Sequence, residues 1–71
     1  MAEPTTAFRC YVTADGVKGP YCGGSNDNTT AALIATTVYQ LAQAVNPSNT
    51  RGVGVYDPSD ELIAYIGRTP P

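Results

Sequence analysis

The sequence predicts a small α+β domain in which two β-hairpins flank a single helix and all four strands share one sheet. Apolar residues alternate with a period of two near both ends of the chain, and turn signals interrupt each alternating stretch. Between the two stretches, apolar residues recur at helical spacing. The 71 residues allow one domain. We expect it to span residues 8–67, between a flexible N-terminal arm (1–7) and a polar C-terminal tail (68–71).

The first predicted hairpin joins a strand over residues 8–13 to a strand over residues 17–22. One face of the first strand carries its apolar side chains, which are Phe8, Cys10 and Val12. Asp15 and Gly16 are typical of a two-residue type I′ turn, which needs positive φ at both positions. Pro20 has no backbone N–H to donate, so the second strand is expected at an edge of the sheet.

The same hairpin predicts the state of the two cysteines in the chain. With a two-residue turn, Cys10 would lie opposite Tyr21, and Cys22 would lie opposite Arg9. The two sulfurs would then point to opposite faces of the sheet, too far apart for a disulfide. We therefore expect free thiols, and a thiol redox protein is the weakest of the three functional hypotheses.

The helix is predicted over residues 28–45. Gly23 and Gly24 interrupt the preceding strand, and Asn46-Pro47 ends the helix because proline disfavours the α conformation at the residue before it. Apolar residues follow the spacing i, i+3, i+7, i+10 and i+14, which predicts a stripe that packs on the sheet. The stripe consists of Ala31, Ile34, Val38, Leu41 and Val45.

The second predicted hairpin joins residues 52–57 to residues 61–67 through a type I turn with Pro58 at its second position. In the last strand, Leu62, Ala64 and Ile66 would share one face, and Ile63 and Tyr65 the other. A strand that is apolar on both faces belongs in the middle of a sheet, whereas a glycine-containing strand suits an edge. Numbering the strands in chain order, we predict the spatial order 2-1-4-3.

The residues that commonly perform catalysis are scarce. Histidine is absent, which removes the commonest general base and the usual partner of a serine or cysteine nucleophile. Two cysteines separated by eleven residues do not form a zinc motif. The carboxylates of Asp57, Asp60 and Glu61 are explained by a solvated turn. We therefore expect a protein that is not an enzyme and that uses no metal or cofactor.

The charge and hydropathy patterns limit the partners. Four scattered cations and a net charge of −2 argue against binding to nucleic acid. No apolar run approaches the roughly 20 residues that a membrane span requires, and no signal-peptide pattern begins the chain. We expect a cytoplasmic protein that does not bind membranes.

The most site-like segment is the glycine-rich stretch that leads into the helix. Free N–H groups and the positive end of the helix dipole can hold a phosphate there, although Asp27 would repel an anion and helix capping alone explains the composition. A binder of nucleotides or other anionic ligands is therefore the alternative hypothesis. Its candidate ligand-binding residues are Gly23, Gly24, Ser25, Asn28, Thr29 and Thr30, with Arg51 and Arg68 to neutralise the charge.

Two predicted surfaces suit a protein partner. The stretch from Asn28 to Thr50 contains no charge, which is typical of interface centres. The sheet face away from the helix is expected to collect aromatic residues, and we favour this face slightly over the helix. The candidate interface residues are Tyr11, Tyr56, Ile63 and Tyr65 on the sheet and Thr37 and Gln40 on the helix.

The leading hypothesis is a non-enzymatic binding protein that works as a homo-oligomer. A domain of this size buries only about 60% of the surface that its unfolded chain exposes, so self-association is a direct source of further stability. The oligomer would mask or sequester a partner, which is either another protein or an anionic small molecule.

Overall fold

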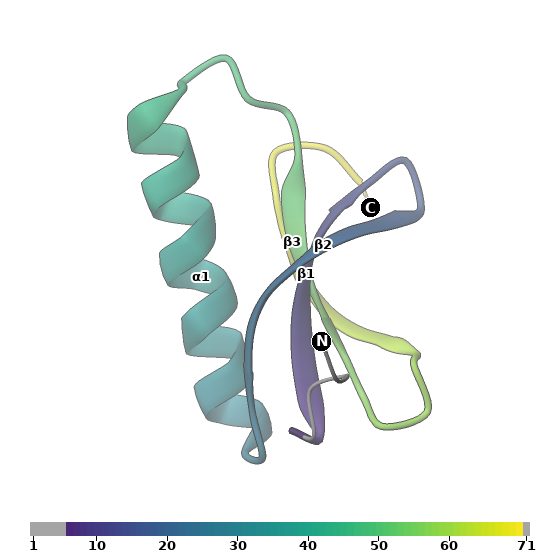
Figure 1. The fold of residues 1–71 in the computed structure, drawn as a ribbon. Helices are drawn as coiled ribbons and strands as arrows, with labels where there is room; N and C mark the ends of the chain where they lie inside the picture. Colours follow the sequence, from purple (N-terminus) through teal and green to yellow (C-terminus); the bar gives the residue numbers. More distant parts are fainter. Residues whose placement is uncertain (1–5, 71) are drawn as a thin grey trace.

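The computed structural model describes residues 6–70 and contains one antiparallel sheet with a helix against one face (Figure 1). The elements are β1 (Phe8–Ala14), β2 (Val17–Ser25), α1 (Asn28–Val45), β3 (Gly52–Tyr56) and β4 (Leu62–Ile66). The predicted α+β class and the ββαββ order are confirmed. Most of the predicted N-terminal arm (1–5) and Pro71 lie outside the described residues.

The observed strand order is β2-β1-β3-β4, so the predicted 2-1-4-3 order is wrong. β3 is central and buried at every residue, whereas β4 lies at the edge. Glycine in β3 does not mark an edge but makes room for side chains of neighbouring strands. A Cβ at Gly54 would lie 2.7 Å from Cδ1 of Leu62 and 2.9 Å from Oγ1 of Thr13.

The first hairpin has the predicted two-residue turn. Ala14 pairs with Val17, and the turn residues Asp15 and Gly16 have φ angles of 55° and 76°. Irregularities further along the hairpin place extra residues in β2, which twists and bends a strand. Tyr21 therefore pairs with Tyr11, and the predicted pairing of Tyr21 with Cys10 is wrong.

The same irregularities move the two cysteines. Both are free thiols, as expected, but they do not lie on opposite sides of the sheet. Cys10 belongs to the core beneath the helix, where its thiol donates to the carbonyl oxygen of Ala31 at 3.2 Å. Cys22 packs against the same core and donates to the carbonyl oxygen of Cys10 at 3.3 Å. The geometric reason given for the free thiols was therefore wrong.

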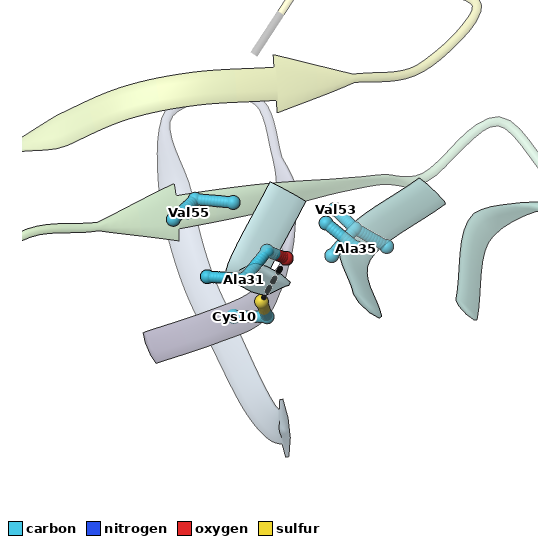
Figure 2. Packing of buried hydrophobic residues seen from close by; sticks show 5 residues of the cluster. All are labelled: Cys10, Ala31, Ala35, Val53 and Val55. Atoms are coloured by element: carbon cyan, nitrogen blue, oxygen red, sulfur yellow. Dashed lines mark hydrogen bonds between the residues drawn. The ribbon is translucent and has the colours of Figure 1, made fainter. Parts of the chain in front are cut away.

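The core between α1 and the sheet is made of small residues (Figure 2). Its buried members are Cys10, Ala31, Ala35, Val53 and Val55. The two alanines on α1 allow the helix backbone to approach the sheet closely. The core therefore combines a closely approaching helix with larger side chains packed at its margin, among them Phe8 and Tyr39.

The predicted helix stripe meets this core only at its N-terminal half. Ile34 and Val38 pack against the core, but Leu41 and Val45 are 62% and 86% exposed. An 18-residue helix is about 27 Å long, whereas a five-residue strand such as β3 spans about 17 Å. The C-terminal end of α1 therefore extends beyond the strand that forms the centre of the sheet.

A bulge in β4 changes which of its side chains share a face. Tyr56 pairs with Leu62 and Val55 pairs with Ala64, so Ile63 has no partner in β3. Leu62 consequently lies on the face away from the helix, near Thr13, and not on the face of Ala64 as predicted. The predicted alternation along this strand is correct only after the bulge.

Candidate functional site

The sheet face away from α1 carries a cluster of three tyrosines at its centre. The ring of Tyr11 meets the rings of Tyr21 and Tyr56 edge-on, with centroid distances of 5.6 and 5.4 Å. The hydroxyl groups of Thr13 and Tyr56 lie 3.1 Å apart, within hydrogen-bonding distance. Tyr11 and Tyr56 are only 9% and 8% exposed, so these two predicted interface residues come together but offer little contact area.

Lys18 covers this cluster. Its ammonium nitrogen lies 4.7 Å from the ring centroid of Tyr11 and 5.3 Å from that of Tyr56, in reach of cation–π attraction. The same nitrogen forms a 2.6 Å ion pair with Asp60, which raises the pKa of Lys18. Residues from both hairpins thus close the centre of the face over Tyr11 and Tyr56, whereas Tyr21 is 43% exposed.

Tyr65 occupies the outer part of the same face. It pairs with Gly54, and its ring lies so close to Gly52 and Gly67 that neither position has room for a Cβ. Its hydroxyl group is buried and has no hydrogen-bond partner among residues 6–70. Tyr65 is therefore half-buried against backbone and is a packing residue as much as a surface residue.

The predicted anion site is not assembled as a unit. The carboxylate of Asp27 accepts hydrogen bonds from the backbone N–H and the hydroxyl of Thr30, at 2.8 and 2.9 Å. These bonds lower the pKa of Asp27, so its negative charge sits where a phosphate would bind. Arg68 lies near the other end of α1, where it donates to the side chain of Gln43 and to the carbonyl of Pro47.

The other predicted anion-binding residues have structural roles or no described contact. Gly23 adopts a φ of 146° and leaves space for the side chain of Ile34. Ser25 accepts a hydrogen bond from the backbone of Asp27, and the hydroxyl of Thr29 donates to Asn28. Arg51 is exposed at the start of β3, beyond the C-terminal end of α1.

The outer surface of α1 is the main exposed apolar area on the helix. Leu33 and Leu41 are 63% and 62% exposed, and the predicted interface residues Thr37 and Gln40 are exposed beside them. The hydroxyl of Thr37 donates to the carbonyl of Leu33, which turns its polar group towards the helix backbone. We call Leu33, Thr37, Leu41 and Val45 the outer helix row.

Sequence reasoning assigned this row incompletely. Leu41 and Val45 were expected in the core, and Leu33 was not among the candidate interface residues. The signal was present, because α1 carries more apolar residues than one stripe can bury.

A hollow of about 240 Å³ indents this surface; its lining is Thr30, Leu33, Ile34, Thr37 and Val38.

The edge strand β4 forms a second exposed apolar area. Leu62 and Ile63 are 39% and 46% exposed, and Ala64 is exposed as well. A groove of about 100 Å³ separates β4 from α1, with Ala32 and Thr36 on its helix side. Its volume is well below the roughly 300 Å³ at which small-molecule pockets begin.

Two further observations concern chemistry and membranes. Within residues 6–70, no group of three or more Cys, Asp or Glu side chains is placed to hold a metal ion. No helix in this part of the chain is long and apolar enough to cross a membrane.

No protein-family model, no curated protein and no solved structure matches this chain. The functional assignment therefore rests on the surfaces described above.

Proposed function

We propose that this chain is a small non-enzymatic binding protein that acts in the cytoplasm as a homo-oligomer and sequesters a protein partner. The outer helix row is the observation that carries the proposal. Exposed leucine and valine side chains on a helix without charge are costly to leave in water and favourable to bury against another protein. Nucleic acid is not the partner, because four scattered cations supply little phosphate attraction.

The outer helix row suits recognition of another protein better than recognition of a small ligand. Its hollow of about 240 Å³ offers a small ligand few polar groups to bind, since its lining is mostly apolar. A partner that presents apolar side chains at helical spacing would fill this surface in the way that an amphipathic helix fills a groove. An anionic ligand would find no cation among the residues that line it.

A site-specific photo-crosslinking experiment tests this function. A photoreactive phenylalanine derivative replaces Leu33, which is 63% exposed, and in a matched control it replaces Val17, which is 66% exposed on the first hairpin. In cells of the natural host, we expect the Leu33 probe, but not the Val17 probe, to form a product with a heavier protein. Adding Leu41→Lys should abolish that product.

Two outcomes would contradict the proposal. Equal crosslinking from both positions would mean that the helix row has no special affinity. A product from Leu33 that contains only a second copy of this chain would make the row an oligomer interface and leave no surface for the proposed partner.

A further inference from the structure

We propose that Cys10 and Cys22 are a site of reversible oxidation, at which the two thiols form a disulfide bond within one chain. The bulge in the first hairpin brings the two residues together on the side of the sheet that faces α1. The site goes beyond the proposed binding function, and neither its chemistry nor its test depends on that function.

The bulge places two residues of β2 opposite Cys10. Cys10 pairs with Gly23. The next residue of β1, Tyr11, pairs with Tyr21, so Cys22 is the extra residue between the two pairs. In a β-bulge, two residues on one strand oppose a single residue on the other strand. Cys22 and Gly23 therefore share Cys10 as their cross-strand neighbour.

Both cysteine side chains lie on the face that packs against α1. The thiol of Cys10 donates to the carbonyl oxygen of Ala31 on the helix at 3.2 Å (Figure 2). Cys22 packs against the core that contains Cys10, and its thiol donates to the carbonyl oxygen of Cys10 at 3.3 Å. Tyr21 turns to the opposite face, where its ring contacts the ring of Tyr11. The two thiols are thus neighbours on one face of adjacent strands.

The spacing of cross-strand neighbours suits a disulfide bond. Residues that lie opposite each other in an antiparallel pair have Cβ atoms about 4.5–5.5 Å apart. A disulfide bond needs Cβ atoms about 3.5–4.5 Å apart. Rotation of the two side chains and an approach of the strands by about 1 Å would therefore join the sulfur atoms.

The two thiols differ in their access to an oxidant, which sets the order of the reaction. Cys10 is fully buried, whereas Cys22 is half-buried. A small disulfide such as oxidised glutathione therefore reacts first with Cys22, whose thiolate attacks one glutathione sulfur and displaces the other glutathione as a thiolate. The Cys10 thiolate then attacks the Cys22 sulfur and releases the second glutathione. The chain gives up two protons and two electrons, and the oxidant takes them up as two molecules of reduced glutathione.

Burial protects the reduced form of the site. It raises the pKa of Cys22 from 9.0 to about 11 and also raises the pKa of Cys10. Because the thiolate is the form that attacks a disulfide, the exchange is slow at neutral pH, and free thiols persist in a reducing compartment. Such a pair suits a response to sustained oxidation better than the catalysis of thiol exchange.

Thiol titration and intact mass measure the bridge after the native chain is incubated with oxidised glutathione at mildly alkaline pH. The free thiols should fall from two to none per chain, and the mass should fall by two hydrogen atoms, with no glutathione attached and no covalent dimer. The bridge restricts the unfolded chain, so the oxidised chain should melt at a higher temperature than the reduced chain.

A shifted cysteine pair provides the matched control. The variant combines Cys22→Ser with Tyr21→Cys, which moves the second thiol to the face of Tyr11, away from Cys10. Tyr21 is 43% exposed, so its replacement leaves the core intact. The new thiol is open to glutathione but cannot reach Cys10 in the folded chain. This variant should therefore stop at the mixed disulfide with glutathione.

Each other outcome overturns the site. A natural pair that keeps its free thiols, retains glutathione or links two chains would show that the two sulfur atoms do not reach each other. A control that bridges as readily as the natural pair would show that the bond forms through the unfolded chain and owes nothing to the bulge. An oxidised chain that does not melt above the reduced chain would show that the bridge strains the fold.

Discussion

Lys18 shows how a single long side chain can protect a sheet face in a very small domain. Its ammonium group lies over the rings of Tyr11 and Tyr56, and Asp60 fixes its position from the other hairpin. Burial of aromatic rings beneath a lysine leaves the charge in water while removing the rings from it. The open face is therefore a second, smaller packing centre, and its tyrosines are less available for an interface than the sequence suggested.

Gly54 provides a test of the corrected strand order. Gly54→Ala should lower the free energy of unfolding by about 1–3 kcal/mol, because the new methyl group would overlap Leu62 and Thr13 from the flanking strands. Urea denaturation measures this change. Gly16→Asn is the control, since the turn has open space and asparagine tolerates positive φ, so its effect should be much smaller. An alanine that is tolerated at position 54 would mean that β3 is not packed between β1 and β4.

The buried thiols predict a loss of stability at alkaline pH. Burial, and secondarily the neighbouring Cys10, raises the pKa of Cys22 from 9.0 to about 11. Burial also raises the pKa of Cys10. The unfolded chain therefore releases these protons at lower pH than the folded chain, so stability is fully retained below pH 9 and falls as pH rises towards about 11.

Urea denaturation at a series of pH values measures this dependence. The decline should be shallower for Cys22→Ala than for the unmodified chain, because the variant has no thiol that can lose a proton at that position. Identical declines for the two proteins would show that Cys22 is not buried against Cys10 as described.

At the scale of the element, α1 depends on one capping residue. Asp27 accepts hydrogen bonds from Thr30 at the first turn, and its charge also interacts favourably with the helix dipole. Asp27→Ala should lower the melting temperature clearly, whereas Asp27→Asn should lower it less because the amide oxygen still accepts a hydrogen bond. Circular dichroism at neutral pH measures both variants.

The lowered pKa of Asp27 adds a dependence on acid. Its contribution is present above its ordinary pKa of 3.8 and is lost as pH falls through the lower folded value. The difference in melting temperature between Asp27→Asn and the unmodified chain should therefore shrink in acid. A difference that stays constant with pH would mean that the charge contributes nothing to the cap.

Local signals in the sequence predicted the helix, the strands and the first turn, but they did not predict how these elements are arranged. Asp15-Gly16 predicted the turn and Asn46-Pro47 predicted the helix end, because each depends on the backbone preferences of adjacent residues. The bulge at Ile63 carries no comparable signal, since it results from how β4 fits against β3. Glycine in β3 was ambiguous because both an edge position and close packing by neighbours favour glycine.

The sequence likewise predicted some features of the candidate site and missed others. Absence of charge from α1 could be read directly from the sequence, and the exposed Thr37 and Gln40 lie on the surface where they were expected. The low exposure of Tyr11 and Tyr56 could not be foreseen, because it depends on Lys18 and Asp60 meeting from different hairpins. Separation of Arg68 from the N-terminus of α1 likewise follows from the strand order.

The folded chain is compact, but it leaves apolar side chains exposed among residues 6–70. Its radius of gyration is 11.3 Å, close to the roughly 11 Å expected for a globular domain of this length. Apolar side chains remain exposed at several places among residues 6–70, and the proposed function assigns one of these places, the outer helix row, to a protein partner.

Sedimentation equilibrium of the unmodified chain across a wide concentration range measures its self-association. We expect the mass to rise with concentration towards twice the 7.4 kDa of one chain. A mass that stays at 7.4 kDa up to high micromolar concentration would contradict it.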